Sequence, residues 1–245
     1  MRSSLAALVI MPNRPRRFVP GVSLHVRQRG NNRCAVFGDD EDYESYLLML
    51  RSATARYDIA VHGFSLMTTH THLQLTPSTE IGASAAMKEL GVRYVLYFNR
   101  RYQRVGTLWT GRFRAKPIDD ERYWISCLRY IEQNPVRANI VVQADQYRWS
   151  TYRAHAFGDA VEWLASHPVL DALGSNPEQR RSAYRAICAT PLTTAELVRQ
   201  RFDDPAQTRV RPRSDPGLTP SPSEGDPGSL EATAPRRRSR SRSSP

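Results

Sequence analysis

The sequence predicts an α+β domain in which helices cover one face of a mainly antiparallel sheet. Segments with strand and helix periodicity follow one another in the order strand, helix, strand, strand, helix, strand, helix. Strands joined by short connections pair as antiparallel neighbours, and the helices are left to cover the sheet. With 245 residues, of which 40% are apolar, the chain can bury a sizeable core.

The first half of this pattern ends near residue 76. Over residues 22–26 apolar and polar side chains alternate, which predicts a strand with one buried face. Residues 39–57 begin with an acidic turn and continue with apolar residues at helical spacing, which predicts a helix. Residues 59–67 and 70–76 are typical of two strands, joined by a short Thr68-Thr69 turn.

The second half contains a helix over residues 83–104 and a single strand or hairpin over residues 107–118. A third helix is expected from Asp120, after which acidic residues continue, to about Asn134. Residues 146–200 contain aromatic and helical segments to which the sequence alone assigns no arrangement.

Composition divides the chain into four parts. Residues 12–157 hold the predicted domain, and residues 158–202 form a helical C-terminal extension. Residues 1–11 are expected to be an N-terminal extension that an upstream start adds. Residues 203–245 are rich in proline, serine and arginine and almost lack large apolar residues, which predicts a disordered tail.

The formal net charge of +11 and the pI of about 10.1 indicate an acidic partner, with nucleic acid the first candidate and an anionic membrane surface the second. Only Lys88 and Lys116 are lysines, so a coding bias toward arginine is the competing explanation. Three widely spaced cysteines indicate neither a disulfide framework nor a thiolate zinc site, and they favour a reducing cytoplasm. No apolar run approaches the roughly 18 residues of a membrane span.

Two histidines, His70 and His72, are separated by one residue on a predicted strand. Side chains two apart on a strand point to the same face, so both imidazoles can reach one metal ion. The alternative is that these histidines face solvent or are satisfied by hydrogen bonds.

The third predicted helix carries Tyr130 and Asn134 one turn apart on the same face, next to a more apolar face. Tyr130 therefore does not have to lie in the core. The alternatives are a half-buried aromatic ring for Tyr130 and a helix end for Asn134, because Pro135 disfavours helical geometry in the residue before it.

Four segments together resemble a known family. They are residues 20–30 (PGVSLHVRQRG), 67–73 (MTTHTHL), 106–114 (GTLWTGRFR) and 129–138 (RYIEQNPVRA). In this order and at these separations they resemble single-tyrosine transposases of the HUH superfamily, and most of all the REP-associated tyrosine transposase branch. The resemblance covers about residues 12–157. It implies a ferredoxin-like fold, with metal-binding histidines on a central strand and a nucleophilic tyrosine on a following helix.

Residue by residue, the resemblance implies that His70 and His72 bind the metal, that Tyr130 is the nucleophile and that the Asn134 amide completes the metal site. It implies cleavage and strand transfer of single-stranded DNA through a 5′-phosphotyrosine, with Mg²⁺ or Mn²⁺ as cofactor. Single-stranded or hairpin DNA is the implied partner, and a homodimer remains open. Two departures are present: Thr71 replaces a bulky apolar residue, and Thr68-Thr69 replaces a Pro-Asn pair.

Basic and aromatic residues near the predicted site are expected to bind DNA, because guanidinium groups hold phosphates and rings stack on unpaired bases. They are Arg93, Tyr97, Arg100, Arg101, Arg104, Trp109, Arg112, Arg114 and Lys116. The alternative for each is an exposed charge or a packed ring.

Two other functions remain open from the sequence. One is a catalytically silent DNA-binding regulator that keeps the transposase fold, which the threonine replacements motivate. The other is a metal hydrolase that uses the histidine pair without the tyrosine.

Overall fold

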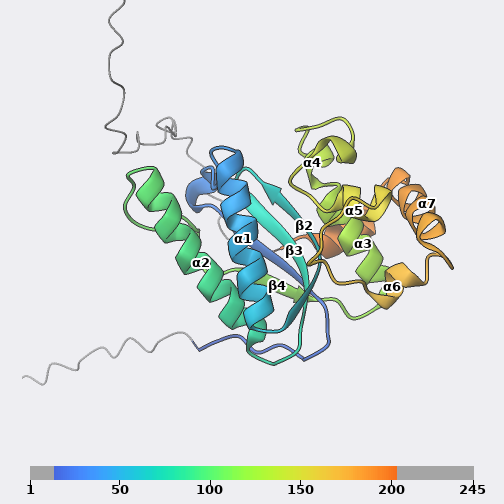
Figure 1. Ribbon diagram of the computed structural model, residues 1–245, viewed down its shortest axis with the longest axis horizontal. Coiled ribbons are helices and arrows are strands. Elements are labelled where there is room, and N and C mark those ends of the chain that lie inside the picture. Colours follow the sequence, from blue (N-terminus) through green and yellow to red (C-terminus); the bar gives the residue numbers. More distant parts are fainter. Residues whose placement is uncertain (1–13, 203–245) are drawn as a thin grey trace, which may run out of the picture.

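The computed structural model describes residues 14–202 (Figure 1). The predicted N-terminal extension at residues 1–11 and the predicted tail at residues 203–245 lie outside the described residues.

A four-stranded antiparallel sheet forms the centre of the protein. Its strands are β1 (Leu24–Arg29), β2 (Ile59–Met67), β3 (His70–Pro77) and β4 (Arg114–Pro117), in the order β2-β3-β1-β4. With a helix between β1 and β2 and another between β3 and β4, this is the ferredoxin-like βαββαβ arrangement. The predicted fold class is confirmed.

The two crossover helices, α1 (Asp40–Arg56) and α2 (Gly82–Arg101), lie side by side on one face of the sheet (Figure 1). Crossovers between parallel strands are right-handed, which places both helices on the same face. They bury the apolar side of the central strands, including Leu24 and Val26 of β1 and Leu73 and Leu75 of β3. The sequence prediction of helices on one face holds for these two helices.

The third long helix, α3 (Glu121–Glu132), packs on the opposite face. It follows the last strand and is no crossover, so its apolar side is free to cover the face that α1 and α2 leave open. Asp120 caps its start by accepting from the Tyr123 amide, and Trp124 Nε1 donates to Ser23 Oγ at 3.0 Å. Gln74 of β3 donates to the Trp124 carbonyl at 3.2 Å, which fixes the helix against the sheet.

The remaining helices form a second layer together with α3. They are α4 (Asn134–Arg137), α5 (Tyr152–Phe157), α6 (Pro168–Asp171), α7 (Pro177–Ala189) and α8 (Thr194–Gln200). The 3₁₀ turns η1 (Asn31–Arg33) and η2 (Ala144–Gln146) lie in the connections. A second apolar core joins α3 to α7 through Leu128, Ile131 and Tyr184. No helix within residues 14–202 is long and apolar enough to cross a membrane.

Some predicted boundaries differ from the structure. The first strand begins at Leu24 rather than at residue 22 and ends at Arg29. The second crossover helix ends at Arg101 rather than at residue 104, because Gln103 has a positive φ of 50°. Of the strand or hairpin expected over residues 107–118, only β4 forms, and Trp109 makes an isolated bridge to Gly30.

Candidate active site

The histidine pair lies at the start of the central strand β3, on the face of the sheet that α3 partly covers. His72 is only 2% exposed, and the His70 and His72 ring centroids are 5.0 Å apart. In the sheet register, Arg27 of β1 lies directly opposite His72, and Arg114 of β4 lies directly opposite Arg27. Arg29 likewise lies opposite His70. Positive side chains from two other strands therefore share the face of the histidines.

Both histidines have their Nδ1 atom engaged in a hydrogen bond. His72 Nδ1 lies 2.8 Å from Nε2 of His25, and His70 Nδ1 lies 3.1 Å from Thr69 Oγ1. This leaves Nε2 on each ring as the atom with the chemistry of a metal ligand. Burial lowers the pKa of His70 to about 3 and that of His72 well below its ordinary value, with further lowering by nearby positive charges. The rings are therefore neutral at pH 7, as metal binding requires.

Tyr130 approaches the histidines from α3. Its ring centroid is 5.7 Å from that of His72 and 5.7 Å from that of His25, edge to face in both cases. The Arg137 guanidinium lies over the Tyr130 ring with its carbon 4.6 Å from the centroid. A cation over the ring and two imidazoles at its edge hold the tyrosine on the histidine face.

Asn134 follows Tyr130 by one turn and is largely buried. Its amide nitrogen donates to the Tyr130 carbonyl at 3.0 Å, which fixes the side chain against the helix. Its amide oxygen is the atom with the chemistry of a metal ligand. The helix indeed ends nearby, since α3 stops at Glu132 and Asn134 begins the short helix α4.

The donor set fits a divalent cation held by few protein ligands. Within residues 14–202, no group of three or more His, Cys, Asp or Glu side chains could hold a metal ion. A cation would therefore rely on Nε2 of His70 and His72, with the Asn134 amide and substrate oxygens as further ligands. Within the described residues, each of these neutral imidazoles is hydrogen-bonded through Nδ1, which leaves its Nε2 for a cation.

The threonine departures leave this donor set intact. Thr71 is fully buried and faces the other side of the sheet, where Tyr46 donates to its hydroxyl at 3.4 Å. Thr69 bonds to His70 and helps to orient that ring. Neither replacement removes a group from the histidine face.

A basic groove of about 570 Å³ runs over β1 and β4, and its lining includes Arg27 and Arg29, which lie opposite His72 and His70 in the sheet register. The Arg27 guanidinium carbon lies 5.1 Å from the centre of the Phe202 ring, which forms one wall. The positively charged residues that line the groove are Arg16, Arg27, Arg29, Arg112, Arg114 and Lys116. Such a groove attracts a phosphate backbone.

Three of the residues expected to bind DNA lie in this groove, namely Arg112, Arg114 and Lys116. Arg112 is exposed at its rim. Lys116 donates to the carbonyl of Arg199 at 3.2 Å and to that of Arg201, so it also anchors the C-terminal extension.

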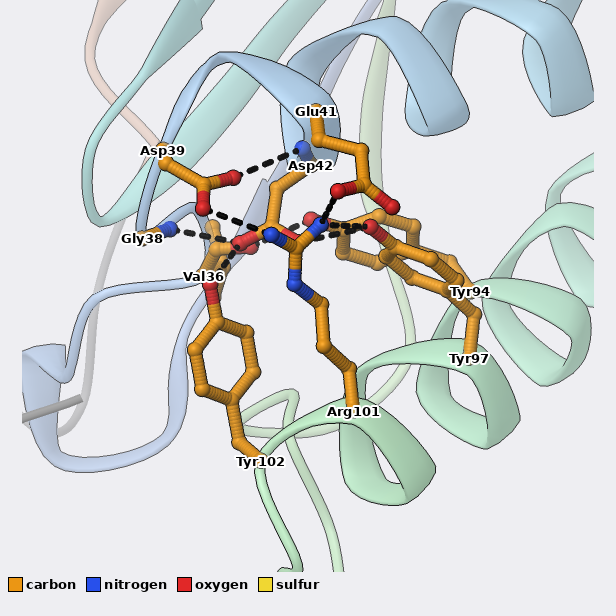
Figure 2. A network of polar contacts seen from close by, with 9 residues as sticks. All are labelled: Val36, Gly38, Asp39, Glu41, Asp42, Tyr94, Tyr97, Arg101 and Tyr102. Carbon is orange, nitrogen blue, oxygen red and sulfur yellow. Dashed lines mark hydrogen bonds and ion pairs between the residues drawn. The ribbon is translucent and has the colours of Figure 1, made fainter. Parts of the chain in front are cut away.

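Four candidates on α2, and Arg104 just after it, do not reach the histidine face, because α2 covers the opposite side of the sheet. Figure 2 shows Arg101 in contact with Asp39 at 2.6 Å and with Glu41 at 2.7 Å. Tyr97 donates to the fully buried Asp42 at 2.9 Å in the same network, which ties α1 to α2. These two side chains stabilise the fold rather than lining the groove.

The remaining candidates from α2 and the segment after it, and the Trp109 ring, also have surroundings that differ from those expected. Arg93 pairs with Glu89 at 3.3 Å, and Arg104 lies over the Phe98 ring. Arg100 is exposed on the outer side of α2. Trp109 is 5% exposed and belongs to the main core, so its ring is not open to a base.

The sequence interpretation missed His25, Arg27, Arg29 and Arg16. The signal for the first three was present, because His25, Arg27 and Arg29 follow one another at spacing two and therefore form one polar face of a strand. What the sequence lacked was the strand order, which places this face beside the histidine pair.

Comparison with known families identifies the class of protein. Residues 18–134 match the family described as "Transposase IS200 like", a span that includes the sheet, the histidine pair and Tyr130. Over this span, slightly less than half of the chain, the sequence is similar to this transposase family. No curated protein sequence matches it.

Among solved structures, the chain is similar to the REP-associated tyrosine transposase bound to a REP hairpin. The identity is 18%, the TM-score is 0.51, and the match covers 64% of this chain and 93% of that chain. It supports the fold. A protein of Deinococcus radiodurans R1 described as a transposase is 19% identical over 45% of this chain and 89% of its own, with a TM-score of 0.35.

Proposed function

We propose that this transposase cleaves single-stranded DNA with Tyr130 and transfers the strand through a 5′-phosphotyrosine, beside a divalent cation held by His70 and His72. The observation that carries the proposal is the approach of Tyr130 to His72, which with His70 forms a pair of neutral imidazoles hydrogen-bonded through Nδ1, on the sheet face where Arg27 and Arg29 line a basic groove. The DNA class is a single strand flanking a hairpin, by analogy with the REP hairpin bound by the structural relative.

The groove supplies binding and orientation. Arg27, Arg29 and Arg114 would hold the phosphates on either side of the scissile bond, since Arg27 and Arg29 lie opposite His72 and His70 in the sheet register and Arg114 lies opposite Arg27. A divalent cation bound at this site would polarise a non-bridging oxygen of the scissile phosphate. Imidazole ligands suit Mn²⁺ better than Mg²⁺.

The chemical step is an exchange of one phosphate ester for another. The phenol oxygen of Tyr130 forms a bond to phosphorus, and the bond from phosphorus to the 3′ oxygen breaks. Tyr130 loses one proton and the leaving oxygen gains one, which gives a free 3′-hydroxyl. The tyrosine ester retains the energy of the original bond, so a second 3′-hydroxyl can reverse the step and join a new strand without ATP.

The test is formation of a covalent adduct between the full chain and a hairpin oligonucleotide with randomised single-stranded flanks. With the label at the 3′ end and Mn²⁺ present, the label should move with the protein on a denaturing gel. Tyr130→Phe should abolish the adduct and keep DNA binding, because only the attacking oxygen is removed. Tyr123→Phe, on the same helix but in the second core, is the matched control and should keep the adduct.

The other two functions give different results in the same assay. Cleavage without an adduct would indicate a metal hydrolase. Binding without cleavage, in the presence of Mn²⁺ or Mg²⁺, would indicate a silent regulator. Either result would refute the proposed transfer mechanism.

A further inference from the structure

We propose that His25 is a positioning residue for the metal-binding pair: its Nε2 accepts the Nδ1 proton of His72 and so fixes the tautomer that offers His72 Nε2 to a cation. This inference rests on the proposed function, because it assigns His25 a task at the same site. It adds a residue of β1 to a site that otherwise consists of residues from β3 and from the helices α3 and α4.

The contact itself is direct and buried. His25 is fully buried on β1, and its Nε2 lies 2.8 Å from His72 Nδ1. A hydrogen bond between two imidazole nitrogens requires one donor and one acceptor. If His72 Nε2 is the ligand atom, Nδ1 must carry the proton, and His25 must be the acceptor. The second hydrogen bond of a metal-binding histidine commonly sets its tautomer and ring orientation in this way.

The same assignment places the proton of His25 on its Nδ1, where an acceptor is needed. Within residues 14–202, His25 Nδ1 and Gln200 Oε1 are both buried and have no hydrogen-bond partner. Gln200 belongs to α8, and its side chain lies beside His25, whose ring centroid is 4.7 Å from that of Phe202, two residues further along the chain. An unpaired donor and an unpaired acceptor on adjacent side chains complement each other, because each alone is costly to bury. Gln200 is therefore the residue that would orient His25.

The surroundings of His25 favour this task over packing alone. A second buried histidine, His62 on β2, uses both ring nitrogens in hydrogen bonds: Nδ1 donates to the Ala165 carbonyl at 3.0 Å, and Nε2 accepts from Thr76 Oγ1 at 2.8 Å. It contacts Trp124 rather than the metal-binding pair. His62 thus offers a matched control for removal of a buried imidazole from the same sheet face.

The experiment compares His25→Leu, His25→Gln and His62→Gln in the full chain without DNA. The first readout is the tautomer of His72 in metal-free protein, from the nitrogen chemical shifts of its ¹⁵N-labelled imidazole. The second readout is the Mn²⁺ affinity by calorimetry, with thermal unfolding as a check on folding. Neither depends on cleavage activity.

The unmodified protein should show His72 protonated at Nδ1. His25→Leu should give a mixture of tautomers and weaken Mn²⁺ binding about 10-fold to 100-fold, the usual cost of losing such a partner. His25→Gln supplies an amide oxygen as acceptor and should restore most of the affinity, and His62→Gln should leave both readouts unchanged. Gln200→Met, which keeps His25 but removes its acceptor, should weaken Mn²⁺ binding less than His25→Leu does.

Several results would overturn the inference. They are an unchanged tautomer and affinity in His25→Leu, equal losses in His25→Leu and His62→Gln, or a His72 protonated at Nε2 in the unmodified protein. If His25→Leu does not fold, His25→Gln and Gln200→Met carry the same test. Absence of Mn²⁺ binding by the unmodified protein would count against the proposed function, and the tautomer of His72 would still decide the role of His25.

Discussion

Replacing Gly63 with alanine should displace the helix that carries Tyr130. Gly63 lies on β2, beside an irregularity in its pairing with β3, and faces α3. A Cβ added there would lie 2.3 Å from Leu128 Cδ1 and 3.1 Å from Thr151 Oγ1. Carbon atoms in contact normally lie about 3.5–4.0 Å apart. Leu128 is fully buried, so it cannot turn away into solvent.

The magnitude follows from this overlap. Relief requires α3 to move by about 1 Å, and forced repacking of this kind costs about 1–3 kcal/mol of unfolding free energy. Tyr130 is two residues beyond Leu128 on the same helix, so it moves with it. A misplacement of about 1 Å at a reacting group can cost about 100-fold in rate. We expect Gly63→Ala to lose about 100-fold in adduct formation while its DNA affinity stays within a few fold.

The assay combines chemical denaturation, DNA binding and adduct formation on the same preparation. Gly91→Ala is the control, because its added Cβ meets nothing nearer than 3.7 Å, and alanine within a helix stabilises by about 0.5–1 kcal/mol. The double variant with Gly63→Ala and Leu128→Ala should lose less unfolding free energy than the sum of the losses in the two single variants. The reason is that the new methyl group at residue 63 fills part of the space that the leucine side chain leaves. Full adduct formation and unchanged stability in Gly63→Ala would refute the packing of α3 described here.

Three further predictions concern other parts of the molecule. Burial lowers the pKa of His62 to about 4, below its ordinary 6.5, so the folded protein resists its protonation and stability should fall as the pH decreases from about 6.5 to about 4. At pH 5.5 the expected loss of unfolding free energy from His62 is about 1.4 kcal/mol. In His62→Gln this loss should be absent when unfolding by denaturant is measured as a function of pH. Glu132→Gln should destabilise by about 2–4 kcal/mol in the same assay, because the buried carboxylate accepts from Thr151, His155 and Tyr184; a loss below 1 kcal/mol would contradict this. Arg114→Ala should lower the salt dependence of single-stranded DNA affinity by the equivalent of about one phosphate contact, whereas Arg100→Ala on α2 should leave it unchanged. Equal effects of the two changes would contradict DNA binding in the groove.

Local periodicity was enough to predict the fold class and the pairs of residues within one element. His70 and His72 share a face because strand side chains alternate, and their rings lie 5.0 Å apart. Tyr130 and Asn134 stay one turn apart, where a hydrogen bond joins them. Such relations depend only on the geometry of a single strand or helix turn, which the sequence pattern specifies directly.

Which residues line the groove was decided by contacts between elements that are distant in the sequence. β1 pairs with β3 and β4 rather than with the next strand β2, and this places His25 against His72 and Arg27 beside it. The same topology sends α2 to the other face and so removes Arg101 from the site. Period and spacing tell which side chains share a face of one element, but strand order and crossover side decide which faces meet, and these are set by long-range packing.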